Sequence, residues 1–279
     1  MKQLLNLKHT MKPNANRHIG IFDSGLGGLT VLKQLKHQLP NEKFIYFGDT
    51  AHVPYGNKSA DTINNYVMQI ANFLIQQNVK LIIIACNTAS SVSLKKIRQK
   101  IAVPSIDVIT PSITAISKLT NIKTIGVIGT ETTINSLAYQ NQIKKINHQY
   151  NVIAQPCSLF VPLIEEGLSN HSLADAVVKM YLDNNFCSKI DALILGCTHY
   201  PMLKDKIAQY LNNSQHIIDS STATAQYVKQ YLNTNRLTIE DSNTLRNQFY
   251  VSDKVSRFNE IASMFLNEQI INIQQIDLQ

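Results

Sequence analysis

Short apolar runs alternate with helix-length amphipathic segments along almost the whole chain. Segments such as 29–39 and 60–77 repeat apolar residues at helical spacing. This alternation is typical of parallel β-sheets covered by helices. The sequence therefore predicts an α/β protein with mostly parallel sheets. The predicted strands are IGIF (19–22), KFIYF (43–47), KLIIIA (80–85), SIDVI (105–109), KTIGVIG (123–129), NVIAQ (151–155), DALILG (191–196), HIID (216–219) and QFYV (248–251).

Two pairs of segments resemble each other at nearly the same offset. IGIFDSG at 19–25 resembles IGVIGTE at 125–131, 106 residues further on, and LIIIACNTAS at 81–90 resembles DALILGCTHYP at 191–201, with 111 residues between the cysteines. A chain of 279 residues is long enough for two domains of ordinary size. We therefore expect two similar α/β halves, preceded by a loose arm at residues 1–17.

Charge and composition exclude several classes of protein. The 26 Lys and Arg exceed the 19 Asp and Glu, but they are scattered and form no basic stripe with interleaved aromatics, which argues against a nucleic-acid partner. The 44% hydrophobic and 16% charged residues are typical of a soluble globular protein, and no apolar run reaches the roughly 18 residues that span a bilayer. The opening LLNL is too short for a secretory signal. We expect a cytoplasmic protein without a membrane partner.

A polar, glycine-rich turn, DSGLGG (23–28), follows the first predicted strand. In open parallel sheets, ligands collect outside the carboxyl ends of the strands. Asp23 and Ser24 lie at such an end, and the glycines after them would let the backbone approach a ligand closely. The turn matches neither the GxxxxGK[ST] phosphate loop nor the GxGxxG dinucleotide motif, so a plain strand-to-helix turn is the alternative.

A second polar loop, GDTAHVPYGNKS (48–59), carries Asp49, His52, Tyr55 and Gly56. Ser59 can cap the helix that follows it. Loops of this kind carry binding groups more often than the rest of a fold does, although many are only connections.

Two further turns, ACNTAS and GCTHYP, place Cys86 and Cys197 at the ends of apolar runs. Good helix caps follow each thiol, namely Asn87 and Thr88 in one turn and Thr198 in the other. A helix N-terminus can bind a carboxylate and lowers the pKa of a nearby thiol. One such cysteine would be interpreted as a small buried hydrophobe, but two in matching turns favour a function.

Two thiols on opposite sides of one ligand could invert a stereocentre, because one can remove a proton from carbon while the other delivers a proton to the opposite face. Asp23 near one thiol, and His199 with Glu165 near the other, could shuttle or orient protons. A metal site made by Cys86, Cys197 and His199 is the alternative, but it lacks a clear fourth ligand.

The two remaining cysteines, Cys157 and Cys187, lack such a polar turn and are predicted to be structural.

Six segments together resemble the glutamate racemases of the aspartate/glutamate racemase superfamily. They are DSGLGGL (23–29), PYGNKS (54–59), ACNTAS (85–90), GTETTINS (129–136), LFVPLIEEG (159–167) and GCTHYP (196–201). The resemblance implies a 1,1-proton transfer at Cα of D- and L-glutamate without cofactor or metal, which supplies D-glutamate for peptidoglycan. It implies that Cys86 and Cys197 are the two acid/base residues.

The same resemblance implies a fold and a set of site residues. The fold is two flavodoxin-like domains with the active site between them, the first at 18–109 and 223–279 and the second at 110–222. The catalytic residues would be Cys86, Cys197, Asp23, His199 and Glu165. The substrate-binding residues would be Asp23, Ser24, Pro54, Tyr55, Gly56, Asn87, Thr88, Thr130, Thr133, Thr198 and His199.

Partners are also implied by the resemblance. We expect a homodimer. The N-terminal arm resembles those of racemases activated by UDP-N-acetylmuramoyl-alanine, which makes that precursor a candidate activator. Ser158 departs from the pattern, because a proline is expected after Cys157.

Alternative functions remain open from the sequence. An aspartate racemase or a related amino-acid racemase differs in substrate by as little as one methylene, worth only about 1 to 3 kcal/mol in a pocket. The pair of cysteines excludes the single-thiol pattern of arylmalonate decarboxylases. A non-catalytic amino-acid-binding protein would keep the cleft without the turnover.

Overall fold

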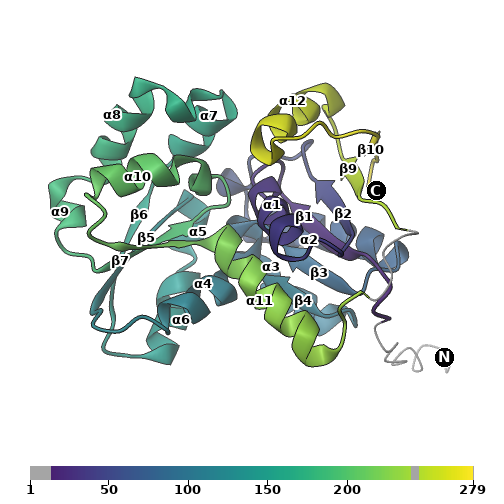
Figure 1. Cartoon of the computed structure of the whole chain (residues 1–279), viewed down its shortest axis with the longest axis horizontal. Helices are drawn as coiled ribbons and strands as arrows, with labels where there is room; N and C mark the ends of the chain where they lie inside the picture. Colours follow the sequence, from purple (N-terminus) through teal and green to yellow (C-terminus); the bar gives the residue numbers. More distant parts are fainter. Residues whose placement is uncertain (1–13, 240–244, 279) are drawn as a thin grey trace.

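The structure is a computed structural model that describes residues 14–239 and 245–278. The predicted arm at residues 1–17 therefore lies largely outside the described residues. The chain forms two sheets in which every strand pairing is parallel. In Figure 1 these two sheets lie side by side, with α8, α9 and α10 at one end and α12 at the other. The α/β prediction is confirmed.

The first sheet has the order β10-β9-β2-β1-β3-β4 and the second the order β6-β5-β7-β8. The strands of the first sheet are β1 (Ile19–Asp23), β2 (Phe44–Gly48), β3 (Leu81–Ile84), β4 (Ser105–Asp107), β9 (Gln248–Val251) and β10 (Ile273–Gln275). Those of the second are β5 (Thr124–Gly129), β6 (Asn151–Pro156), β7 (Ala192–Gly196) and β8 (His216–Asp219). Both sheets contain the order second-first-third-fourth strand, which is that of flavodoxin-like folds. The internal repeat in the sequence therefore corresponds to a repeat of topology.

The helices cover both sheets. They are α1 (Leu29–Gln38), α2 (Ala60–Gln76), α3 (Asn87–Lys100), α4 (Ile109–Ile116), α5 (Glu131–Asn135), α6 (Ala138–Ile146), α7 (Phe160–Glu165), α8 (Ser172–Tyr181), α9 (Asn184–Cys187), α10 (Lys204–Tyr210), α11 (Ser220–Asn235) and α12 (Val255–Leu266). Three 3₁₀ helices, η1 (Tyr55–Asn57), η2 (Leu168–Asn170) and η3 (Tyr200–Leu203), lie in the connections. Ser59 caps α2 as predicted, because its hydroxyl accepts the Thr62 N–H at 3.2 Å.

One predicted strand extended too far, and one strand was missed. SIDVI was predicted as one strand to residue 109, but β4 ends at Asp107, whose carboxylate accepts the N–H groups of Ile109 and Thr110 at 2.7 Å and so starts α4. Strand β10 was not predicted. Its residues Ile273–Gln275 are mostly polar and exposed at the sheet edge.

Helix α11 joins the two halves. It follows β8 of the second sheet but packs on α1 of the first, and Figure 1 shows it running between the halves. A hydrogen bond from the Thr30 hydroxyl to the Thr198 carbonyl, 2.7 Å long, adds a second link. The predicted domain limits stay a prediction. The limit at 222 falls inside α11.

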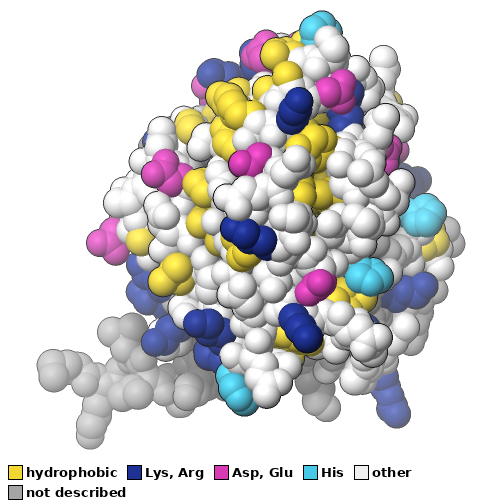
Figure 2. Space-filling view, turned by 90° about the vertical axis from the view of Figure 1, so that its left-hand side faces the viewer, with side chains coloured by type: hydrophobic (Ala, Val, Ile, Leu, Met, Phe, Trp, Pro, Cys, Tyr) yellow, Lys and Arg dark blue, Asp and Glu magenta, His cyan; other side chains and the backbone are white. Residues whose placement is uncertain are grey.

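The face of the second half shown in Figure 2 carries basic, acidic and polar side chains intermingled, with hydrophobic side chains gathered in its upper part. Exposed apolar side chains of the second half include Leu159, Leu173 and Met180, each about half exposed. Within the described part of the chain, no helix combines the length and the apolar character needed to cross a bilayer.

Candidate active site

A cavity of about 440 Å³ lies where the carboxyl ends of the two sheets face each other. Residues directly after β1, β2 and β3 line one side, and residues after β5, β6 and β7 line the other, with α7 completing the wall. Of the predicted site residues, those lining the cavity are Ser24, Pro54, Tyr55, Gly56, Cys86, Asn87, Thr88, Thr130, Glu165, Cys197, Thr198 and His199. Asp23 and Thr133 are buried and do not belong to the lining.

Cys86 lies at the end of β3 in a fully buried setting. Its thiol donates to the Ser24 hydroxyl at 3.4 Å, and its sulfur accepts the Ala89 N–H, also at 3.4 Å, so the cysteine itself caps α3. Burial raises the pKa of Cys86 to about 12, the charge of Asp23 adds to this, and the two hydrogen bonds only partly oppose it. The prediction that the helix N-terminus lowers the pKa of this thiol was therefore wrong. Desolvation outweighs the helix.

Asp23 is the carboxyl group on the same side. Its Oδ2 accepts the Gly25 N–H at 2.9 Å, while Oδ1 is buried without a hydrogen-bond partner among the described residues. Burial raises the pKa of Asp23, and the charge of His199 with the N–H groups of Gly28 and Gly25 only partly offsets this. Asp23 is thus a carboxyl group that readily holds a proton.

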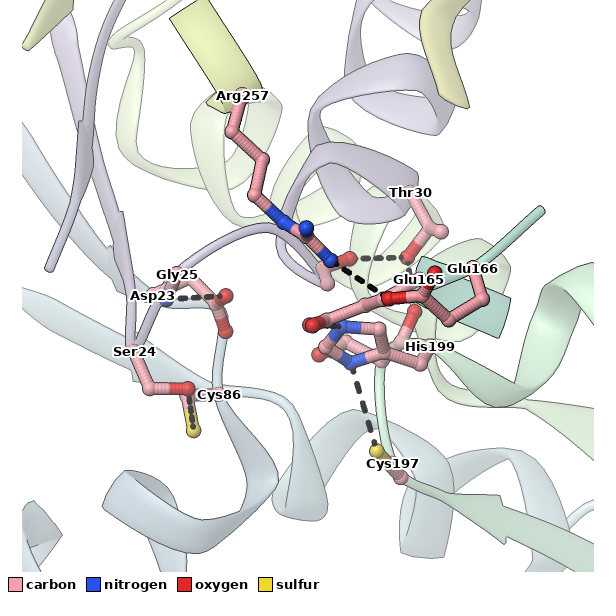
Figure 3. A network of polar contacts seen from close by, with 12 residues as sticks. Asp23, Ser24, Gly25, Thr30, Cys86, Glu165, Glu166, Cys197, His199 and Arg257 are labelled. Carbon is pink, nitrogen blue, oxygen red and sulfur yellow. Dashed lines mark hydrogen bonds and ion pairs between the residues drawn. The ribbon is translucent and has the colours of Figure 1, made fainter. Parts of the chain in front are cut away.

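Cys197, at the end of β7, has a different partner. His199 Nδ1 lies 3.9 Å from its sulfur, and His199 Nε2 lies 2.9 Å from Glu165 Oε1 on α7 (Figure 3). Burial disfavours the imidazolium, but the hydrogen bonds to Cys197 and Glu165 prevail and raise the pKa of His199 to about 10. Burial likewise opposes the charge of Glu165, yet His199 and Arg257 hold the pKa of Glu165 below its usual value. His199 and Glu165 therefore form a charged pair next to Cys197.

Hydroxyl groups from both halves meet at the cavity, whose lining includes Thr88 and Thr130. Thr88 Oγ1 lies 2.9 Å from Thr130 Oγ1 and 3.4 Å from Thr133 Oγ1. Asn87 Oδ1 accepts the Tyr139 hydroxyl at 2.6 Å, which leaves its buried Nδ2 without a partner among the described residues. These groups can hold a carboxylate through neutral hydrogen bonds.

Two glycines of DSGLGG, Gly27 and Gly28, pack against side chains of the protein, whereas Gly25 of the same turn lines the cavity. A Cβ on Gly27 would lie 2.4 Å from His199 Nδ1 and 2.7 Å from Thr198 Oγ1. A Cβ on Gly28 would lie 2.6 Å from the Cβ of Asp23. These two glycines admit side chains of the protein itself, and Gly27 lets the second half bring His199 against the first.

The segment after Cys197 also departs from prediction. Thr198 was expected to cap a helix, but residues 200–203 form the 3₁₀ helix η3, which has no side-chain cap. Tyr200 is fully buried, and its hydroxyl donates to the Cys157 carbonyl at 2.9 Å. Tyr200 thereby ties the Cys197 turn to the turn before α7.

Comparisons with known proteins agree with this architecture. The family model for Asp/Glu/Hydantoin racemase matches residues 19–228. The chain is 43% identical over 263 residues to a glutamate racemase from Neisseria meningitidis, which covers 94% of this chain and 97% of the relative. The chain belongs to the Asp/Glu/Hydantoin racemase family.

Solved structures of the family have the same fold. A glutamate racemase from Francisella tularensis in complex with D-glutamate has a TM-score of 0.88 and 43% identity, covering 95% of this chain and 98% of that one. A glutamate racemase isoform from Bacillus anthracis has a TM-score of 0.90 and 33% identity, covering 95% and 99%. The prediction of two flavodoxin-like units, made from the resemblance, is confirmed for this racemase-family chain.

Several cavity residues of this racemase-family chain were missed. They are Gly25, Leu26, Val53, Asn57, Glu131, Cys157, Ser158, Val161, Pro162, Glu166 and Tyr200. Five of them lie in or beside the LFVPLIEEG segment, which supplied only Glu165 to the prediction. Cys157, predicted to be structural, is buried and borders the cavity, and burial raises the pKa of its thiol. Among the described lining residues none is a lysine or arginine.

The alternative of a metal site has no support in the geometry. Within 14–239 and 245–278, no group of three or more His, Cys, Asp or Glu side chains is arranged to hold a metal ion. The neighbours of each thiol are proton donors and acceptors instead.

Proposed function

We propose that the protein interconverts D- and L-glutamate by a cofactor-independent 1,1-proton transfer at Cα. The observation that carries this proposal is that Cys86 and Cys197 line one cavity from the two halves of the molecule, each with its own polar partners. Relatives named glutamate racemase, at 41 to 43% identity over nearly the whole chain, support glutamate as the substrate.

The proton transfer balances without any other reactant. The thiolate of one cysteine takes the Cα proton, so that an S–H bond forms, the Cα–H bond breaks and the electron pair moves into the α-carboxylate. The thiol of the other cysteine then gives its proton to the opposite face of Cα. At the end the protonation states of Cys86 and Cys197 are exchanged, and the product is the mirror image of the substrate.

Each thiol needs help of its own. We assign His199 to Cys197, because the imidazole lies 3.9 Å from the sulfur and is held by Glu165 at 2.9 Å. The pair can take up and return the proton of the thiol. On the other side, we assign Asp23 to Cys86, because Asp23 directly precedes Ser24, whose hydroxyl accepts the Cys86 thiol at 3.4 Å, and because burial raises the pKa of the Asp23 carboxyl.

The substrate carboxylates are bound by neutral groups in this proposal. The lining offers the hydroxyls of Ser24, Thr88, Thr130 and Thr198 and the amide of Asn87. Glutamate itself carries a net negative charge, and the cavity is lined by Glu131, Glu165 and Glu166. Binding therefore depends on many short hydrogen bonds, because no lysine or arginine stands among the described lining residues and His199 is already paired with Glu165.

Other parts of the proposal follow the family resemblance. The product D-glutamate would serve peptidoglycan synthesis, and a homodimer is expected. Activation by UDP-N-acetylmuramoyl-alanine remains a prediction, because it was tied to the arm at residues 1–17, of which 1–13 lie outside the described residues.

The test is racemisation of single enantiomers, followed by circular dichroism. We expect the signals of D- and L-glutamate to decay to zero without added cofactor or metal, and those of D- and L-aspartate to persist. If only the aspartate signals decayed, the substrate would be aspartate and not glutamate. Binding of glutamate without any decay would make the protein a non-catalytic amino-acid-binding member.

A further inference from the structure

A buried carboxylate lies beneath the loop after β2 and takes part in no step of the proposed reaction. Asp49 is 3% exposed and follows the last residue of β2 directly. Its Oδ2 accepts the Tyr55 hydroxyl at 2.6 Å, and its Oδ1 accepts the Ser252 hydroxyl at 2.7 Å. His52 Nδ1 lies 2.8 Å from the same Oδ1. Three side chains thus converge on one carboxylate.

Tyr55 is the member of this group that reaches the cavity. It lines the wall next to Gly56 although only 2% of its surface is exposed. Burial and the neighbouring Asp49 raise the pKa of Tyr55, so the phenol keeps its proton. That proton is donated to Asp49, so it is not available to a substrate carboxylate. Tyr55 therefore shapes the wall, and its orientation depends on Asp49.

Ser252 attaches the same loop to the distant C-terminal strand. It follows β9, which pairs with β2, and its hydroxyl oxygen also accepts the Ala51 N–H at 2.8 Å. The Thr50 hydroxyl and the backbone of Asp253 form a second clip beside it, with the Asp253 N–H at 2.9 Å from Thr50 Oγ1. Residues about 200 positions apart thereby hold the loop from below.

The other half of the molecule forms a hydrogen bond with the far end of this loop. The Thr132 hydroxyl, on α5, donates to the carbonyl oxygen of Gly56. The loop is therefore fixed at both ends, by Asp49 and Ser252 at its start and by Thr132 at its end. Asp49 thus supports the segment of the loop that contains Tyr55 and Gly56, and both of these residues line the cavity.

We propose that Asp49, held by Ser252, is a positioning residue that sets the cavity wall made by Tyr55 and Gly56 and so determines the affinity for the substrate. Neither Asp49 nor Ser252 contacts the reacting atoms. Their loss therefore changes binding more than it changes the proton-transfer steps. This inference rests on the proposed racemisation of glutamate.

The test compares KM and kcat for D- and L-glutamate in the full-length chain. Asp49→Asn keeps the shape but replaces one acceptor oxygen by a donor NH₂, so Tyr55 and Ser252 can no longer both donate to this side chain. We expect KM to rise about tenfold, equivalent to the loss of one charged hydrogen bond, while kcat changes less than about threefold. Tyr55→Phe should behave alike, and the double variant should be little worse than either single one.

Two milder variants test the same role with less risk that the protein misfolds. Ser252→Ala leaves the bond between Tyr55 and Asp49 in place and should raise KM by about threefold, and Ser252→Thr should restore the parent value because it keeps the hydroxyl. Asp219→Asn is the matched control. Asp219 is also a buried carboxylate, but it bonds to Ser221 and Thr222 at the start of α11, which do not line the cavity. It should lower the melting temperature without raising KM.

The outcomes separate this inference from the proposed function. A parent protein that racemises glutamate, with unchanged KM in Asp49→Asn and Ser252→Ala, would overturn the positioning role alone. If Asp49→Asn and Asp219→Asn lowered kcat and raised KM by equal factors, Asp49 would be only a structural residue. A parent protein that does not racemise glutamate at all would refute the proposed function, which these variants do not address.

Discussion

The turns that carry Cys86 and Cys197 occupy equivalent places in the two halves but differ in their surroundings. Each thiol follows the strand next to the first strand of its sheet, β3 beside β1 and β7 beside β5. After Cys86 comes the regular helix α3, and the nearby ionisable group is a carboxyl, Asp23. After Cys197 comes the short helix η3, and the partner is an imidazole.

The repeated scaffold thus places the two thiols at equivalent positions. The residues around each thiol, Asp23 near Cys86 and His199 near Cys197, determine how that thiol gains and loses its proton. Because two enantiomers have equal free energies, kcat/KM must be the same in both directions at every pH. The asymmetry between the two turns is therefore invisible in the overall ratio. It becomes measurable when one half of the reaction is isolated, or when the two turns are compared without substrate.

The largest effects are expected from removing one thiol at a time. Cys86→Ser and Cys197→Ser should each lower racemisation by at least about 10³-fold, within the range for loss of general acid–base catalysis. In D₂O each variant should still exchange the Cα proton of one enantiomer, and the two variants should exchange opposite ones. Proton NMR of the Cα signal measures this exchange.

Because the two turns differ, we expect the two single-thiol variants to exchange the Cα proton at different rates. Cys86→Ser keeps Cys197 with its partner His199, whereas Cys197→Ser keeps only the thiol whose pKa is about 12. We therefore expect faster exchange in Cys86→Ser. Cys187→Ser, at a half-buried thiol outside the cavity lining, is the control and should keep the parent rate. Exchange of both enantiomers by either variant would contradict a two-thiol mechanism.

Intermediate effects are expected from removing the helpers within these single-thiol proteins. In Cys86→Ser, a further Glu165→Gln change should slow the remaining exchange by roughly 10- to 100-fold, because His199 loses the carboxylate that holds it, and Asp23→Asn should matter less than about threefold. In Cys197→Ser the order should reverse. Equal slowing in both backgrounds would mean that Asp23, His199 and Glu165 serve both thiols as one shared network.

The sequence alone predicted the scaffold better than the wall of the cavity. Nine of the ten strands in the described part of the chain were predicted, because buried parallel strands are short apolar runs with polar turns after them. The exception is β10, whose residues IQQ carry no such run. The thiols, Asp23 and His199 were found for the same reason, because they lie directly after strands and share a repeat.

Contacts that depend on tertiary packing were not predictable in the same way. Glu165 lies 34 residues before His199, and although it was named as a helper, no local pattern in the sequence shows that this acid on α7 contacts the imidazole. The pKa of Cys86 was predicted in the wrong direction because a turn shows its helix but not the depth of its burial. The contact of Gly27 with His199 and Thr198 was not predicted, because the sequence does not reveal which side chain of the other half approaches a glycine.

The smallest effect, and the one that compares the two turns without substrate, is the pH dependence of stability. Folding raises the pKa of His199 from 6.5 to about 10, so its stabilising contribution is complete below pH 6.5 and is lost as the pH rises through about 10. For Cys86, raised from 9.0 to about 12, the corresponding loss begins only near pH 9. The free energy of unfolding should therefore fall with pH from 6.5 upward in the parent protein.

Two variants show which residue causes this fall in the free energy of unfolding with pH. His199→Asn should flatten the curve between pH 6.5 and 9, a difference of about 2 to 3 kcal/mol, whereas Cys86→Ser should follow the parent there and diverge only above about pH 9. Asp23 is present in all three proteins, so its contribution cancels. Urea unfolding at each pH measures the curves. Parallel curves for the parent and His199→Asn would mean that the imidazole is neutral in the resting protein, and Cys197 would then have no charged partner before the substrate arrives.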